Sequence, residues 1–215
     1  MGQSQVIKIV SQPLSVNTYI LFLEDTGEAV VIDPSFYSER ILKVLREEKL
    51  DCRAILLTHG HFDHIAGVSA VREHYHAPVY IHAADAPMLS DPEKNMSAMM
   101  GGLRVQTAPA EQQMKNVEKL HLAGMEIVVL STPGHSPGSV CYLSGDYLFS
   151  GDTLFNLSAG RTDFPGGSME NLNASMELLK KIEKDYIVHP GHEGSTSLQF
   201  EKDNNPFMGN AEWSF

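Results

Sequence analysis

Residues 57–67 read LTHGHFDHIAG, and this stretch places four side chains that bind metals within six positions. His59 and His61 alternate, so in an extended segment they point to the same side. Asp63 and His64 follow where the chain turns into a helix, so they point to a neighbouring position. A single tetrahedral ion cannot easily use four ligands from so short a segment. The stretch therefore predicts two metal positions side by side.

Three later segments supply candidates for the remaining ligands. His135 lies in TPGH, Asp152 in SGD and His192 in HPGH, and a glycine directly precedes each of them. Each segment follows a short apolar run typical of a buried strand, as RAILLT at 53–58 precedes the first stretch. Loops that leave rigid strand ends can converge on one point. With Asp152 bridging, the predicted ligand sets are His59, His61, His135 and Asp152, and Asp63, His64, His192 and Asp152.

A simpler explanation exists for each residue taken singly. A lone histidine in a loop is usually a surface residue, and Asp63 alone would pass as a helix N-cap. This explanation would have to hold independently for three separate strand-loop clusters, so we prefer a metal centre. The remaining histidines lack partner motifs, and we expect surface or supporting roles for them: His74, His76, His82, His121 and His189.

The apolar pattern predicts one domain over 1–215, in which strands and helices follow one another. The predicted strands are 6–10, 17–24, 28–33, 53–58, 77–82, 126–132, 139–144, 147–152 and the start of 186–192. The predicted helices are 38–49 with Ser38 as N-cap, 64–75, 168–184 and 195–205. Residues 88–114 show no such pattern and hold five of the ten methionines.

Composition narrows the class of partner and compartment. The formal net charge is -11, which argues against a nucleic-acid groove because such a groove needs a basic surface. No apolar run approaches the length that spans a membrane, and the first ten residues do not have the pattern of a signal peptide. The two cysteines, Cys52 and Cys141, do not make a disulfide framework, so we expect a cytoplasmic protein.

THGHFDH, together with the later TPGH, GD and PGH, resembles the metallo-β-lactamase superfamily and is most similar to its glyoxalase II (hydroxyacylglutathione hydrolase) group. The resemblance implies an α/β fold, a four-layer αββα sandwich of two mixed sheets flanked by helices, with metals at one edge. A true β-lactamase fits less well, because Asp152 stands at the bridging position and neither cysteine stands at a ligand position. Only 23 residues follow His192, which matches a shorter bacterial branch of the group.

The resemblance implies two Zn²⁺ ions per chain, with iron or manganese as alternatives in either site. The expected reaction is attack of a metal-bridging hydroxide on a carbonyl, with Asp152 bridging the ions and Asp63 aiming the hydroxide. A thiolate leaves with little help, because the pKa of its conjugate acid is about 8.5. An amide nitrogen would need a general acid. The expected substrate is therefore a thioester such as S-lactoylglutathione.

The loop SAGRTDFPGGS at 158–168 carries the candidates for substrate contacts. Arg161 can clamp a carboxylate, and the resemblance implies that a basic residue of this region contacts glutathione; a salt bridge with Asp163 is the alternative. Phe164 either lines the pocket or packs the loop. Asp33 either orients a ligand or forms a turn with Pro34.

Two further questions stay open in the sequence. The stretch 88–114 is either a lid or hydrophobic wall, or a core filler or the contact of a homodimer. The rival activity is a mononuclear Fe(II) persulfide dioxygenase, whose family shares the fold and a loop like GRTDF at 160–164. Its iron would be held by His59, His135 and Asp152. The intact HGHFDH set favours the hydrolase, and a metal-binding module without catalysis is the least favoured hypothesis.

Overall fold

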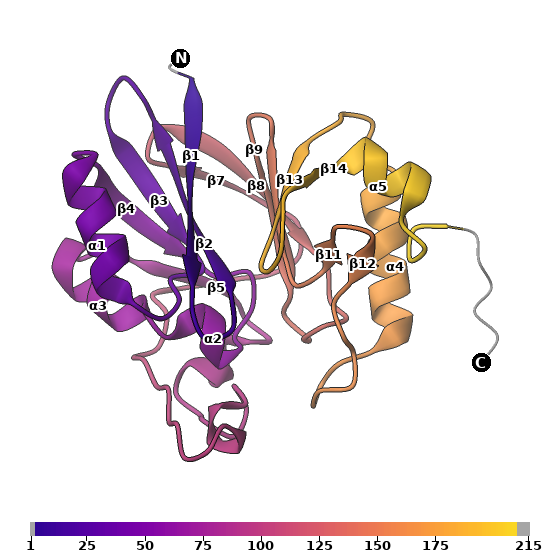
Figure 1. Cartoon of the computed structure of the whole chain (residues 1–215), viewed down its shortest axis with the longest axis horizontal. Helices are drawn as coiled ribbons and strands as arrows, with labels where there is room; N and C mark the ends of the chain where they lie inside the picture. The colour runs from indigo at the N-terminus through magenta and orange to yellow at the C-terminus, as the bar shows by residue number, and fades with distance from the viewer. Residues whose placement is uncertain (1–2, 210–215) are drawn as a thin grey trace.

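The computed structural model describes residues 3–209, and in it two β-sheets lie face to face with helices on their outer sides (Figure 1). The first sheet has six strands in the order β1-β2-β3-β4-β5-β6. Its strands are β1 Ser4–Ser11, β2 Val16–Leu23, β3 Glu28–Ile32, β4 Asp51–Leu56, β5 Val79–His82 and β6 Gln112–Met114. The pairs from β1 to β3 are antiparallel and those from β3 to β6 are parallel, so this sheet is mixed.

The second sheet also has six strands, in the order β14-β13-β10-β9-β8-β7. Its strands are β7 Glu118–Leu122, β8 Met125–Ser131, β9 Val140–Ser144, β10 Tyr147–Gly151, β13 Ile187–Pro190 and β14 Thr196–Ser197, and a separate hairpin joins β11 Leu154–Phe155 to β12 Ser158–Ala159. Only β10 and β13 pair in parallel among these described strands. The predicted αββα sandwich of two mixed sheets is confirmed.

Three apolar cores separate the four layers. In β2, Tyr19 and Leu21 pack in the core between the sheets, whereas Ile20 packs in the core beneath the first pair of helices. Successive side chains of a strand point to opposite faces, so a strand buried on both faces reads as a continuous apolar run. This is why the segment NTYILF does not alternate between apolar and polar residues. The third core lies between the second sheet and its helices, around Leu148 and Met176.

The helices cover the outer faces of the two sheets (Figure 1). α1 Ser38–Glu47 and α3 Val68–Tyr75 lie on the first sheet, and α4 Met169–Lys180 and α5 Leu198–Asn204 lie on the second. In α1, Ile41 and Leu45 are four residues apart and fully buried, so one face of the helix packs on the sheet. α4 begins at a true cap, because the Ser168 side chain accepts a hydrogen bond from the Asn171 amide.

Several predicted helix and strand ends were wrong. The N-cap of α1 is Tyr37, with φ of 59° and no side-chain hydrogen bond, and Ser38 is already helical. The predicted helix 64–75 is two helices, α2 Phe62–Ile65 and α3, because the chain bends at Gly67. A Cβ on Gly67 would lie 2.3 Å from the Ser35 carbonyl oxygen, so the backbones touch there. α1 and α4 end earlier than predicted, at residues 47 and 180, and α5 begins later, at residue 198.

The stretch 88–114 is ordered by short turns. It contains the second half of η1 Ala86–Leu89, all of η2 Ser97–Met99 and β6. The sequence did not predict β7, whose residues are exposed or half-buried at the edge of its sheet and therefore lack an apolar run. Within residues 3–209, no helix combines the length and the apolarity that crossing a membrane requires.

Strand direction places the functional loops. β3, β4 and β5 run parallel in the first sheet, and β8, β10 and β13 share one direction in the second because β9 is antiparallel to both β8 and β10. The loops that follow these strands therefore leave from common edges of the two sheets. They meet at the end of the sandwich where α2 lies (Figure 1).

Candidate metal centre

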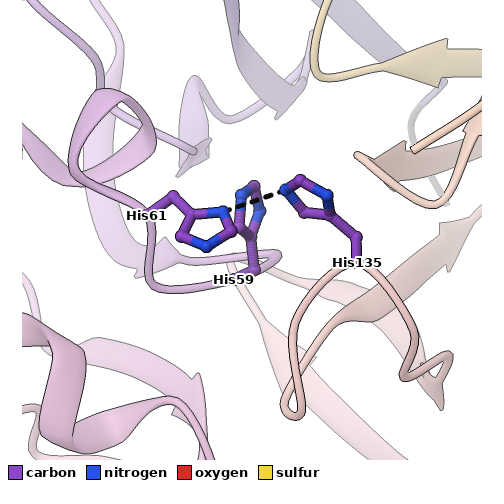
Figure 2. A group of neighbouring side chains, drawn as sticks. All are labelled: His59, His61 and His135. Carbon is purple, nitrogen blue, oxygen red and sulfur yellow. Dashed lines mark hydrogen bonds between the residues drawn. The ribbon is translucent and has the colours of Figure 1, made fainter. Parts of the chain in front are cut away.

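The first ligand group consists of His59, His61 and His135. Figure 2 shows His59 and His61 on one loop and His135 on another, with their rings turned toward one another. One ligand nitrogen from each ring lies within 4.8 Å of the other two, and all three residues are buried. His61 Nδ1 is 2.9 Å from His135 Nε2. The loop after β4 and the loop after β8 thus bring three imidazoles to one point.

The second ligand group consists of Asp63, His64 and His192. α2 carries the first two residues, and His192 follows β13. Asp63 Oδ2 lies 3.6 Å from His192 Nε2 and 3.9 Å from His64 Nε2. The start of α2 therefore places Asp63 and His64 in a second group beside the first, with the His64 ring centre 4.1 Å from that of His59.

Asp152 lies between the two groups. Its Oδ2 is 3.5 Å from His135 Nε2 and 3.5 Å from His192 Nε2, and its Oδ1 is 3.4 Å from His64 Nε2. A carboxylate in this place can reach one ion with each oxygen. A Cβ on Gly191 would lie 2.2 Å from Asp152 Oδ1, so the glycine leaves the room that the carboxylate needs.

Four of the histidines use Nδ1 for an outer hydrogen bond. Such a bond fixes the tautomer and turns Nε2 toward the centre. The partners are Thr58 Oγ1 at 3.1 Å for His59, Asp33 Oδ2 at 2.9 Å for His64, the Arg161 carbonyl at 2.8 Å for His135 and the Leu14 carbonyl at 3.1 Å for His192. The rings are therefore held in orientation by groups that lie outside the two ligand sets.

Asp33 supports the centre from behind. Its carboxylate accepts hydrogen bonds from the Thr58 amide at 2.7 Å and the Thr58 hydroxyl at 2.6 Å, and it faces His64 Nδ1. Its backbone has φ of 50°, so it also makes the turn after β3. Of the two roles considered from the sequence, the structure places Asp33 in both.

The donor set fits metal ions. His59 Nε2, His64 Nε2 and Asp152 Oδ1 are buried and have no hydrogen-bond partner. Buried polar atoms without partners are rare because they lose their hydration without replacement. Imidazole nitrogens and carboxylate oxygens that face one another in this way are ligands suited to zinc, iron and manganese. Ions at the two groups would satisfy these atoms.

The electrostatics of the centre favour added positive charge. Burial and the neighbouring imidazoles lower the pKa of His59 well below its usual value and that of His61 to about 4, so both rings are neutral ligands at neutral pH. For His64, burial lowers the pKa, but Asp152, Asp63 and Asp33 outweigh it and raise the pKa to about 10. Three carboxylates around one ring create a strong preference for a cation.

Asp85 is a supporting residue that the sequence reasoning missed. It is fully buried, and its carboxylate accepts hydrogen bonds from the Gly60 amide at 3.0 Å, the Ser136 hydroxyl at 2.6 Å and the Gly138 amide at 2.7 Å. It therefore ties the loop of His59 and His61 to the loop of His135. One feature could have indicated this role: Asp85 lies three residues after β5, which runs parallel to β4 and therefore ends at the same edge of the sheet.

A cavity of about 910 Å³ opens beside the metal centre. It reaches ligands of both groups and is lined by Arg161 and Phe164, the two residues predicted to contact substrate. The Arg161 guanidinium pairs with Asp163 through two hydrogen bonds, at 2.6 and 2.5 Å, and its Cζ lies 4.2 Å from the centre of the Phe164 ring. The salt bridge with Asp163, one of the two alternatives considered for Arg161, is thus present, and the contact with a substrate carboxylate stays a prediction.

The five other histidines do not join the centre. No group of three ligand-type side chains within residues 3–209 includes any of them. His189, the nearest in sequence to a ligand, packs on aromatic rings, with Phe149 at 5.3 Å and Tyr19 at 4.9 Å between ring centres.

Comparison with protein families and curated proteins gives consistent relatives. The profile of the Metallo-beta-lactamase superfamily matches residues 12–192. The chain is 38% identical over 199 residues to Probable metallo-hydrolase YqgX of Bacillus subtilis, which covers 91% of this chain and 93% of that protein. It is 30% identical over 192 residues to Hydroxyacylglutathione hydrolase GloC of Haemophilus influenzae, covering 87% of this chain and 91% of that one.

Two solved structures are also similar. The BLEG-1 B3 metallo-beta-lactamase superposes with a TM-score of 0.91 at 41% identity and covers 96% of this chain and 100% of its own. TTHA1623, solved in a di-iron-bound form, superposes with a TM-score of 0.81 at 35% identity, covering 94% of this chain and 99% of its own. The likeness therefore extends over nearly the whole chain in sequence and in fold.

Proposed function

The chain belongs to the metallo-beta-lactamase superfamily, and from this premise we propose that it is a two-metal hydrolase of thioesters such as S-lactoylglutathione, with zinc in both positions. One observation carries the proposal: two ligand groups meet at Asp152 and open into a single cavity. The relatives named as metallo-hydrolase and hydroxyacylglutathione hydrolase support the reaction class.

When bound, the two ions would supply Lewis acidity, which makes a water nucleophilic at neutral pH and polarises the carbonyl of the substrate. Asp63 would orient that water, a role supported by its position in the second group and in the lining of the cavity. Burial raises its pKa, but the facing His64 and His192 outweigh burial and lower the pKa to about 2. At neutral pH Asp63 therefore accepts a hydrogen bond rather than donating one.

The leaving group points to a thioester. A thiol has a pKa of about 8.5, so its thiolate departs without prior protonation. An amine needs a proton as it leaves. Of the charged side chains that line the cavity outside the two ligand groups, Arg161 holds its proton permanently, and Glu193 is exposed. The cavity thus has no well-placed general acid among the described residues.

The test combines metal analysis with three activities on one sample purified without added metal. About two zinc ions per chain, cleavage of S-lactoylglutathione and no oxygen uptake with glutathione persulfide are the expected results. Nitrocefin is included because a similar structure is a B3 metallo-beta-lactamase. Hydrolysis of nitrocefin without any thioester cleavage would contradict the proposal.

A persulfide dioxygenase with one iron is the second candidate. One observation supports iron as the metal: a relative with 35% identity was solved in a di-iron-bound form. His59, His135 and Asp152 would hold the ion as two imidazoles and one carboxylate. About one iron per chain with persulfide-dependent oxygen uptake would establish this candidate in place of the hydrolase.

A further inference from the structure

The cavity beside the metal centre has an apolar wall built from the segment 95–105. Met96 is nearly buried, whereas Met99 and Met100 are 71% and 47% exposed, and all three line the cavity. Phe155 and Phe164 line it as well. Large apolar side chains that gather at an exposed cavity mark a surface that an apolar partner covers. Three methionines of the stretch 88–114 thus form a wall of the cavity, whereas Met88 and Met114 are buried in the interior.

The wall is fixed to the metal centre by hydrogen bonds. Asn95 is fully buried, and its side-chain amide donates to the Met88 carbonyl at 2.9 Å and to the Val105 carbonyl at 2.9 Å. The main-chain carbonyl of Asn95 accepts a hydrogen bond from the Phe62 amide at 3.0 Å. Phe62 begins the helix that carries Asp63. The apolar wall therefore has a set position relative to the ligands.

Away from the metal ligands, the charges that line the cavity offer little to an anionic group of a substrate. Among the described residues that line it, Arg161 is the one side chain with a permanent positive charge, and Asp163 already engages its guanidinium with two hydrogen bonds. Glu193, which also lines the cavity, adds a negative charge. A carboxylate of the substrate would have to displace Asp163 to reach Arg161. The glutathione moiety carries two carboxylates.

We propose that this site prefers, over S-lactoylglutathione, a thioester with an apolar acyl chain and an uncharged thiol portion, with the acyl chain lying against Met96, Met99 and Met100. This inference rests on the proposed thioester hydrolysis and names its substrate class. Methionine side chains adapt to chains of different shape, so the site accepts a range of acyl lengths.

The test uses four thioesters, in which a lactoyl or a hexanoyl group is joined to glutathione or to N-acetylcysteamine. Each is assayed with the metal-loaded protein. The expected order of kcat/KM places hexanoyl-N-acetylcysteamine at least about tenfold above S-lactoylglutathione, which corresponds to about 1.4 kcal/mol. Equal or faster turnover of S-lactoylglutathione would overturn the inference while leaving thioester hydrolysis intact.

Binding of thioethers, which cannot be hydrolysed, tests the preferred substrate class separately from thioester hydrolysis. S-hexyl-N-acetylcysteamine and S-hexylglutathione are titrated against the protein by calorimetry. Tighter binding of the uncharged thioether supports the inference even if no thioester is cleaved, in which case the proposed function fails alone. Tighter binding of S-hexylglutathione overturns the inference.

Two variants assign the effect to the wall. Met99→Gln and Met100→Gln keep the length of the side chain but make it polar, and each should lower kcat/KM for the hexanoyl substrate about fivefold more than for the lactoyl substrate. Leu103→Gln is the control, because Leu103 is 38% exposed on the same segment but does not line the cavity. Equal losses on both substrates, or an equal loss in Leu103→Gln, would contradict the placement of the acyl chain.

A third variant tests the charge argument. Asp163→Ala releases Arg161, so the affinity for S-hexylglutathione should rise severalfold while that for S-hexyl-N-acetylcysteamine stays unchanged. An unchanged affinity for the glutathione thioether would show that Asp163 does not block Arg161. The charge argument for an uncharged thiol portion would then fail.

Discussion

Asp152 is the residue on which the two ligand groups depend. Each of its oxygens faces a histidine nitrogen of the ligand groups, and one of the two oxygens, Oδ1, is buried without a hydrogen bond. The sequence predicted this role from the SGD motif at a strand end. Asp85 escaped prediction, because a carboxylate that binds backbone amides leaves no spacing pattern. The pairing of Arg161 with Asp163 was considered but could not be decided, because it depends on the path of the loop.

Asp152→Ala should remove most of the bound metal and lower activity by at least about 100-fold, because both ions lose a shared ligand. Elemental analysis of the purified variant and its kcat/KM on a thioester measure the two effects. Asp146→Ala, an exposed acid on the turn before β10, is the matched control. Full activity with one metal lost would contradict the bridging position.

Asp85→Asn should weaken metal binding at the first ligand group by about 10- to 100-fold and leave the second group nearly unchanged. The amide NH₂ replaces an oxygen that accepts from a backbone amide of Gly60 or Gly138, so the two loops loosen. Titration with Co²⁺, followed by its absorption spectrum, separates the two sites.

The matched variant for Asp85 is Asp33→Asn, which should weaken the second group more than the first, because Asp33 bonds His64 directly and reaches His59 only through Thr58. The unfolding free energy of the metal-free proteins is measured alongside. Equal loss at both sites in Asp85→Asn, or a loss of stability with unchanged metal affinity, would show a general structural role.

At the scale of elements, strands with two buried faces were the easiest to predict. β2, predicted at 17–24, is found at Val16–Leu23. In β4 only the second half is an apolar run, so the strand predicted at 53–58 is found at Asp51–Leu56. The edge strand β7 and the hairpin of β11 and β12 escaped prediction because their pairing partners, and not their own residues, define them. The break between α2 and α3 depends on a backbone contact with the loop after β3, which no local pattern reveals.

Gly67→Ala should destabilise the fold by about 1–3 kcal/mol, because the added methyl group would collide with the Ser35 carbonyl and force the α2–α3 bend open. Gly194→Ala is the control, since nothing lies within 4 Å of a Cβ at that position. Urea unfolding of the metal-free proteins gives both values. Equal stability of the two variants would mean that the bend can relax.

His189 makes the packing of β13 sensitive to acid. Burial, and then the charge of Lys8, lowers its pKa from 6.5 to about 4, so the folded state holds the ring neutral while the unfolded chain protonates it. Its contribution is complete above pH 6.5 and is lost as the pH falls toward 4. His189→Asn should therefore flatten the fall in unfolding free energy between these pH values. An equally steep fall in the variant would contradict this account.

At the scale of the whole molecule, the two sheets each supply part of every ligand set. His59, His61, Asp63 and His64 come from loops of the first sheet, and His135, Asp152 and His192 from loops of the second. The resemblance to a known superfamily predicted this architecture, whereas composition alone predicted only a layered domain. Assembly as a homodimer and residence in the cytoplasm stay predictions.

Because the ligands join the two sheets, bound metal should stabilise the entire sandwich. The melting temperature should rise by several degrees when Zn²⁺ is added to metal-free protein, and it should fall again with a chelator. Differential scanning calorimetry measures the shift. The rise should be much smaller in Asp152→Ala, and a shift of the same size in that variant would indicate binding elsewhere.

The backbone and the side chain of Arg161 have separate roles. Its main-chain carbonyl orients His135, while its side chain faces the cavity. A carbonyl is present whatever the amino acid, so mutation at this position leaves the hydrogen bond to His135 in place. Residue 161 can therefore be exchanged to reshape the cavity without disturbing the orientation of His135, which makes it a natural starting point for laboratory evolution.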